Sequence, residues 1–123
     1  MAYRAAICDD CAADAQFVSE ILKAWADERG AEVNAEIYPS AESFLFAYDE
    51  NKAYDMLLLD IEMGGMDGVS MARRVRAENK TVQIIFITGY SDYIAEGYDV
   101  AALHYLMKPV NREKLFDVLE RAV

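Results

Sequence analysis

Five polar residues that could form a reactive site each stand directly after a short apolar run. Asp9 and Asp10 follow the first run, Asp60 the third, Thr88 the fourth and Lys108 the fifth. If these runs are parallel β-strands, their carboxyl ends meet at one edge of the sheet, and the five side chains lie close together. Each residue alone would be an ordinary helix cap, turn residue or surface lysine. Their joint placement predicts a site.

The residue types at that edge suit the transfer of a phosphoryl group. Carboxylates in a small space repel one another unless a cation neutralises them, and Mg²⁺ prefers hard oxygen ligands. A carboxylate is ionised at neutral pH, so Asp60 can act as a nucleophile without a base. Lys108 supplies a point charge, and Thr88 a hydroxyl donor, for the oxygens of an arriving phosphoryl group. We therefore predict Mg²⁺-dependent phosphoryl transfer to Asp60.

Strands and helices must position these residues. In the sequence, short apolar runs alternate with segments of helical periodicity. The runs predict strands over 3–8, 33–37, 56–59, 83–87 and 103–107. After each strand, apolar residues recur at the spacing of one helix face. Ser40 and Asn111 are placed to cap the second and the last of these helices. The fourth helix, 93–98, has the weakest pattern because Gly97 lies inside it.

The alternation of strands and helices predicts βαβ units and a parallel sheet covered on both faces. Right-handed crossovers leave few topologies for five such strands. We predict an α/β, flavodoxin-like fold: a (βα)5 three-layer sandwich whose parallel five-stranded sheet has the order 2-1-3-4-5. Residues 1–123 are expected to form one domain. The inner face of the last helix is predicted to carry Leu115, Phe116 and Leu119.

Composition excludes several classes of function. The chain has 12 basic and 22 acidic residues and a formal net charge of −10. Such a surface repels phosphate backbones, so direct binding of nucleic acid is not expected. No apolar run reaches the length of a membrane span, and the first residues lack a signal-peptide pattern. With two cysteines that fit a reducing compartment, the chain is predicted to be cytoplasmic.

Four segments together carry a specific pattern: Cys8-Asp9-Asp10, residues 57–63 with 66–68, Phe86-Ile87-Thr88, and residues 105–109. The pattern resembles the response-regulator receiver family of two-component signalling and covers essentially the whole chain. The resemblance implies that a sensor histidine kinase passes a phosphoryl group to Asp60. It also implies regulation of transcription through an output domain absent from this chain. Residues 7–10 and 88–93 look closest to receivers attached to LytTR-type DNA-binding domains.

The resemblance implies a set of metal ligands. Asp10 and Asp60 would bind Mg²⁺ through their carboxylates, and Asp9 would act largely through water. Glu62 stands where the family uses a backbone carbonyl as a ligand. A domain of this kind is not an enzyme with its own substrate. It is a phosphoacceptor that assists its own phosphorylation and dephosphorylation.

The resemblance also implies a switch. Thr88 and Lys108 would hold the phosphoryl oxygens, and the peptide bond between Lys108 and Pro109 would be cis. Tyr105 occupies the position of the switch residue, whose ring turns inward once Thr88 moves toward the phosphoryl group. The change would alter the surface of the fourth helix, fifth strand and fifth helix, through which a homodimer could form.

The chain departs from the family pattern near the site. Gly64 stands where the family usually has proline, which predicts a looser loop after Asp60. Glu62 and Tyr90 lie two residues beyond Asp60 and Thr88, at positions that commonly tune the access of water to the acyl phosphate. Tyr90 is bulky enough to shield it.

Other functions fit the sequence less well. The alternative activity is an aspartyl-phosphate-forming phosphatase of the haloacid-dehalogenase-like type, which would carry an Asp-x-Asp motif on its first strand and a cap over the substrate. A flavodoxin-like cofactor module would need a Gly/Ser/Thr-rich phosphate loop directly after the first strand, where this chain has Asp9 and Asp10. Cys8 and Cys11 form a C-x-x-C motif, but zinc would need two further Cys or His ligands and His104 is the only histidine. The two intervening carboxylates also disfavour a redox dithiol.

Overall fold

The five apolar runs of the sequence form the five strands of one sheet. The strands are β1 (Ala2–Cys8), β2 (Glu32–Tyr38), β3 (Met56–Leu59), β4 (Gln83–Thr88) and β5 (His104–Met107). In the computed structural model, which describes all 123 residues, every neighbouring pair is parallel and the order is β2-β1-β3-β4-β5. The predicted fold class and strand order are therefore confirmed.

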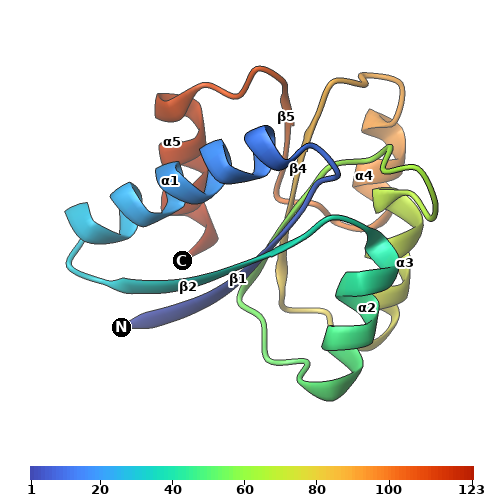
Figure 1. The fold of residues 1–123 in the computed structure, drawn as a ribbon, viewed down its shortest axis with the longest axis horizontal. Helices are drawn as coiled ribbons and strands as arrows, with labels where there is room; N and C mark the ends of the chain where they lie inside the picture. Colours follow the sequence, from blue (N-terminus) through green and yellow to red (C-terminus); the bar gives the residue numbers. More distant parts are fainter.

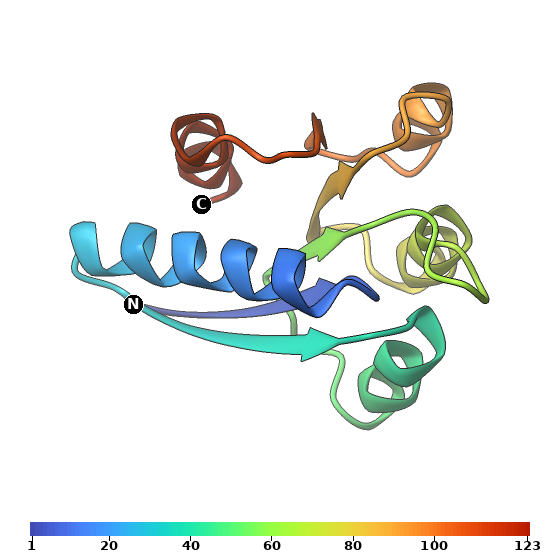
Figure 2. The ribbon, with the colours of Figure 1, turned by 45° about the horizontal axis from the view of Figure 1, so that its top comes forward.

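Five helices cover the two faces of this sheet. They are α1 (Ala12–Glu28), α2 (Ala41–Glu50), α3 (Gly68–Glu78), α4 (Ile94–Asp99) and α5 (Arg112–Ala122). Helices α1 and α5 lie on one face, and α2, α3 and α4 lie on the other (Figure 1 and Figure 2). The helix after β1 therefore lies on one face and the helix after β3 on the other, although β1 and β3 are neighbours in the sheet. In sheets of this kind a crevice for ligands opens at such a point, outside the carboxyl ends of the strands.

Side-chain caps fix where three helices begin. The Ser40 hydroxyl accepts a hydrogen bond from the backbone N–H of Ser43 at 3.1 Å, and the Asn111 amide oxygen accepts one from Lys114 at 3.1 Å. Both caps were predicted from the sequence. The Asp67 carboxylate caps α3 in the same way, through the backbone N–H of Ser70 at 2.7 Å. Each cap satisfies a helix N–H that would otherwise lack a partner.

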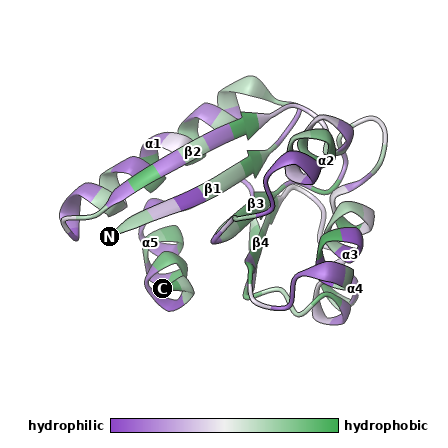
Figure 3. Cartoon of the chain, turned by 90° about the horizontal axis from the view of Figure 1, so that it is seen from below, coloured by the Kyte–Doolittle hydropathy of each residue, from purple (hydrophilic) through white to green (hydrophobic).

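The core is split by the sheet into two apolar layers. One layer packs the sheet against α2 and α3, and the other packs it against α1 and α5. The strands at the centre are apolar along most of their length, whereas the helices carry mixed hydrophobic and hydrophilic stripes (Figure 3). On α5 the predicted inner residues Leu115 and Leu119 are buried, but Phe116 is only half-buried and Val118 takes its place in the core. None of the helices has the length and apolar character needed to cross a bilayer.

Candidate functional site

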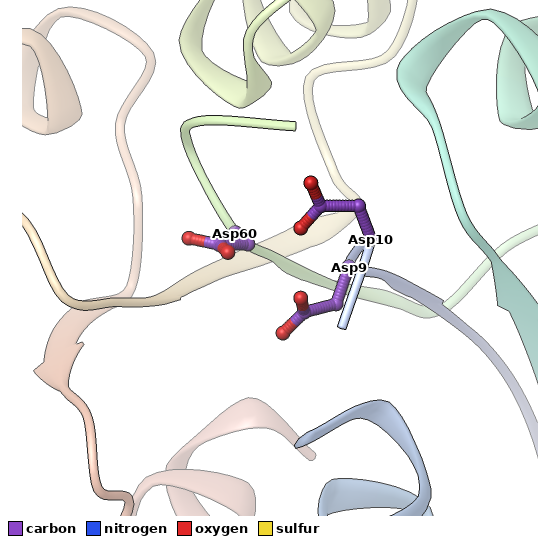
Figure 4. A group of neighbouring side chains, drawn as sticks. All are labelled: Asp9, Asp10 and Asp60. Carbon is purple, nitrogen blue, oxygen red and sulfur yellow. The ribbon is translucent and has the colours of Figure 1, made fainter. Parts of the chain in front are cut away.

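Two strand ends bring the acidic residues together. Asp9 follows β1, where its backbone N–H donates to the Tyr38 carbonyl at 3.0 Å, and Asp60 follows β3, where its N–H donates to the Cys8 carbonyl at 2.8 Å. These hydrogen bonds extend the two strand pairings by one residue, so both aspartates are held by the sheet. Figure 4 shows the carboxylates of Asp9, Asp10 and Asp60 grouped at this edge. This grouping is the one that the sequence predicted.

The three carboxylates have the chemistry of a site for a hard divalent cation. One oxygen from each of Asp9, Asp10 and Asp60 lies within 4.8 Å of the others. Asp9 is 5% exposed and Asp60 6% exposed, whereas Asp10 is open to solvent. Burial raises the pKa of Asp9, with the nearby Asp60 charge adding to the effect against the opposing hydrogen bond from Lys108. Buried, mutually repelling carboxylate oxygens fit Mg²⁺, which would relieve the repulsion and keep waters on the open side.

Lys108 is the cation that this structure places among the carboxylates. Its ammonium group lies 2.8 Å from Asp9 Oδ2, 3.1 Å from Asp60 Oδ2 and 2.8 Å from Asp14 Oδ2. Burial alone would lower the pKa of Lys108, but the hydrogen bonds to these carboxylates raise it, so the side chain stays charged. A permanent positive charge beside Asp60 can attract the oxygens of a phosphoryl group.

Asp14 is the one member of this cluster that the sequence reasoning missed. It lies in the first turn of α1, four residues after Asp10, at the end of the helix that faces the strand ends. That spacing is a signal that could have identified it, but an acidic residue in the first turn of a helix is common because it favours the helix dipole. The signal is therefore weak without the observed contact between Asp14 on α1 and Lys108, which follows β5.

Thr88 and Tyr105 meet at the backbone of Tyr90. Thr88 is fully buried at the end of β4, and its hydroxyl oxygen accepts from the Tyr90 N–H at 3.3 Å. The Tyr105 hydroxyl donates to the Tyr90 carbonyl, and its ring packs on Phe86 at a centroid distance of 5.8 Å. Neither hydroxyl is hydrogen-bonded to a carboxylate of the site. The two predicted switch residues are thus joined through one loop residue beside the site.

The loop after Asp60 is held at several points although it lacks the family's proline. Gly64 adopts a φ of +79°, a left-handed conformation that glycine takes without strain. The Glu42 carboxylate, from α2, accepts a hydrogen bond from the Met66 N–H at 3.1 Å. Asp60 Oδ1 itself accepts one from the Ile61 N–H at 2.7 Å. The looseness that Gly64 suggests is therefore offset by a contact from another helix.

Glu62 and Tyr90 face each other beside the acidic cluster. The side chain of Glu62 is exposed, and Tyr90 is 45% exposed. The hydrogen bond to the Glu62 carboxylate raises the pKa of the Tyr90 phenol. This pair joins the loop after β3, which follows Asp60, to the loop after β4, which follows Thr88.

The features that the sequence analysis set aside have ordinary structural roles. Cys8 is buried in β1, where burial raises the pKa of its thiol, and Cys11 is exposed just before α1. His104 lies in β5, and its Nδ1 accepts from the Tyr105 N–H at 2.9 Å. The peptide bond between Lys108 and Pro109 is cis, as the resemblance implied.

Comparisons with known proteins agree with this arrangement. A family model described as the response regulator receiver domain matches residues 6–120. The transcriptional regulatory protein RprY of Bacteroides fragilis is 34% identical over 104 residues, which cover 83% of this chain and 43% of RprY. The sensory transduction protein LytT of Bacillus subtilis is 31% identical over 83 residues, 66% of this chain and 34% of LytT. This chain therefore spans less than half the length of either relative.

The fold has close counterparts among solved structures. The response regulatory domain of protein mrkE from Klebsiella pneumoniae superposes with a TM-score of 0.86, over 97% of this chain and 93% of that domain. The two sequences are only 21% identical, so the likeness speaks for the fold alone.

Proposed function

The chain belongs to the response regulator receiver family of two-component systems, and on that premise we propose that Asp60 is its phosphoacceptor. In this proposal Asp9, Asp10, Asp60 and the backbone carbonyl of Glu62 hold Mg²⁺. The observation that carries the proposal is the meeting of three carboxylates and the Lys108 ammonium at the carboxyl ends of β1, β3 and β5.

The chemistry proposed for this site is the transfer of a phosphoryl group between a phosphohistidine and a carboxylate. Asp60 Oδ attacks phosphorus, the P–N bond breaks, and the imidazole leaves with its electron pair and takes up a proton. Bound Mg²⁺ would neutralise charge on the carboxylates and on the transferring oxygens. Lys108 would hold one phosphoryl oxygen, and Thr88 would turn its hydroxyl from Tyr90 to another. The same groups let the domain assist its own phosphorylation and the later loss of the group.

The surface proposed to change is formed by α4, β5 and α5. Thr88 and Tyr105 both bond to Tyr90, so a movement of Thr88 toward a phosphoryl group would disturb the hydrogen bond of Tyr105. Apolar side chains are exposed nearby: Tyr98 is 83% exposed, Ile94 46% and Met107 43%. We expect a second copy of this chain to pack on that surface when the domain is phosphorylated.

The partners proposed for the whole protein follow from its family. A sensor histidine kinase would be the donor, and an output domain outside residues 1–123 would act on transcription, as the name of RprY, a transcriptional regulatory protein, suggests for that protein. The family match and the position of the candidate nucleophile after β3 do not favour a haloacid-dehalogenase-like phosphatase. The acidic net charge of −10 supports the view that this domain does not itself bind nucleic acid.

Mass spectrometry of the intact protein tests the proposal. The protein is incubated with Mg²⁺ and acetyl phosphate, beside the variant Asp60→Asn and the control Asp27→Asn, which removes an exposed acid on α1. We expect one phosphoryl group on the wild type and the control, sensitive to EDTA and to hydroxylamine, and none on Asp60→Asn. Labelling of Asp60→Asn would refute the assignment of the phosphoacceptor.

A further inference from the structure

The ammonium group of Lys108 has no hydrogen-bond donor to spare. An ammonium has three N–H donors, and Nζ has a carboxylate oxygen at 2.8 Å from Asp9, at 2.8 Å from Asp14 and at 3.1 Å from Asp60. A phosphoryl oxygen that arrives at Asp60 must therefore displace one of these carboxylates from Lys108. Which of them yields determines how readily the lysine becomes available.

Two of the three partners have another role in the site. Asp9 and Asp60 belong to the buried carboxylate group that would hold Mg²⁺, and Asp60 is the proposed phosphoacceptor. A bound cation satisfies these two carboxylates without the lysine. Their hold on Lys108 therefore weakens once the metal is in place.

Asp14 differs from the other two in its place in the fold and in its exposure. It lies outside the three-carboxylate group, on α1 rather than at a strand end, and its side chain is 46% exposed. Its contact with Lys108 joins residues 94 positions apart in the chain. The hydrogen bond to Lys108 is the main cause that lowers the pKa of Asp14, so this carboxylate stays ionised at neutral pH. Mg²⁺ in the acidic group would leave the Asp14 contact intact.

We propose that Asp14 is a positioning residue that holds Lys108 back from the phosphoryl group. It retains the ammonium on the α1 side of the crevice when Mg²⁺ occupies the carboxylates, and it competes with the phosphoryl oxygens for the same donors. This inference rests on the proposed function of Asp60. Removal of the Asp14 charge frees the lysine and makes the phosphorylated state easier to reach.

The test uses beryllofluoride as the probe for the phosphoryl group, titrated by calorimetry into the full chain at saturating Mg²⁺. We expect Asp14→Asn to bind beryllofluoride about two- to fivefold more tightly than the wild type, the range that fits a half-exposed ion pair. Glu20→Gln removes an exposed charge from the same helix without touching Lys108, and it should leave the affinity unchanged.

A double-mutant cycle separates an effect through the lysine from a general effect of charge. In a Lys108→Met background, Asp14→Asn should no longer change the affinity, because the group that it acts on is gone. Mg²⁺ titrations of the wild type, the two single variants and the double variant give a second readout. Mg²⁺ binds to the carboxylates, so this affinity can be measured even when Lys108 is replaced. There Asp14→Asn should weaken Mg²⁺ binding about twofold in the wild-type background, since a released Lys108 pairs more strongly with Asp9 and Asp60. That change should also be lost with Lys108→Met.

Each other outcome has a definite meaning. Equal or weaker beryllofluoride binding by Asp14→Asn overturns the proposal, and so does a gain that persists in the Lys108→Met background. If the wild type itself binds no beryllofluoride at saturating Mg²⁺, or if Asp60→Asn binds it equally well, the proposed phosphoacceptor site fails and the role of Asp14 fails with it.

Discussion

Replacing Gly68 with alanine would place a methyl group where the backbone of Asp60 already stands. A Cβ built on Gly68 would lie 2.0 Å from the Asp60 carbonyl oxygen and 3.2 Å from Ile61 Cα. The first distance is about 1 Å inside the shortest contact that real Cβ atoms make, and both neighbours are backbone atoms that no side-chain rotation can move. The Gly68 N–H also donates to the Ile61 carbonyl at 2.7 Å, so the start of α3 is fastened to the loop at this point.

The loss of stability in Gly68→Ala comes from the backbone shift that the new methyl group requires. Overpacking of this kind costs about 1–3 kcal/mol, and a backbone hydrogen bond that is lost or stretched adds about 1 kcal/mol. Alanine returns at most about 1 kcal/mol through its better helix propensity. We therefore expect Gly68→Ala to lower the free energy of unfolding by about 1–4 kcal/mol. The shift of α3 should also displace Asp60 and weaken Mg²⁺ binding.

Urea unfolding measures this change. Trp25, the only tryptophan, is buried between α1 and the sheet, and its fluorescence should report the transition. The matched control is Gly89→Ala, because a Cβ at Gly89 meets nothing within 4 Å. The control should be neutral or up to about 1 kcal/mol more stable than the wild type. A Gly68→Ala variant as stable as the wild type to within about 0.5 kcal/mol would contradict the steric clash, as would an equal loss of stability in Gly89→Ala.

Three further predictions concern the metal, the pH dependence and the lifetime of the phosphoryl group. Mg²⁺ at a hundredfold excess over its dissociation constant should add about 2.7 kcal/mol to the free energy of unfolding, and Asp10→Asn should remove most of that gain in the urea assay. The pH dependence concerns Glu36. Burial would raise the pKa of its carboxyl group, but the hydrogen bonds from Arg4 and two tyrosines lower it below its usual value. The lowered pKa contributes to the free energy of unfolding. That contribution is fully present above about pH 4.3, the pKa of an unfolded glutamate, and is lost as the pH falls through the lower pKa of the folded state. Glu36→Gln should therefore cost about 1–2 kcal/mol at pH 7 and much less at pH 3, and an equal cost at both would contradict the assignment. Finally, Tyr90→Ala should shorten the lifetime of the acyl phosphate by opening the crevice to water, and an unchanged decay rate in the mass-spectrometric assay would exclude a shielding role.

Most of the candidate site could be predicted because topology alone brings strand ends together. Each strand is defined by local apolar patterning, and a parallel sheet aligns the carboxyl ends of all its strands. Asp9, Asp10, Asp60 and Lys108 could therefore be grouped from the sequence. The structure brings the three carboxylates within 4.8 Å of one another and Lys108 into contact with Asp9 and Asp60. Their roles toward a metal and a phosphoryl group remain proposals.

Contacts that depend on the packing of one layer against another could not be predicted in this way. The distance of 2.8 Å between Asp14 and Lys108 is set by how α1 and the end of β5 meet across the crevice. The hold of Glu42 on the loop after Asp60 depends likewise on how α2 lies beside that loop. No spacing in the sequence indicates Glu42. The spacing of Asp14 after Asp10 is only a weak signal, because acidic residues are common in the first turn of a helix.

The α/β fold, the strand order and the acidic edge could be predicted from the residues alone, because they depend on local periodicity and on the handedness of βαβ units. The residue pattern did not determine that α5 buries Val118 rather than Phe116, or that Gly68 must pack against the backbone of Asp60. The partners of the Lys108 ammonium became known from the folded chain, because an ion pair depends on distances of about 3 Å. Side-chain packing sets those distances, and strand order does not.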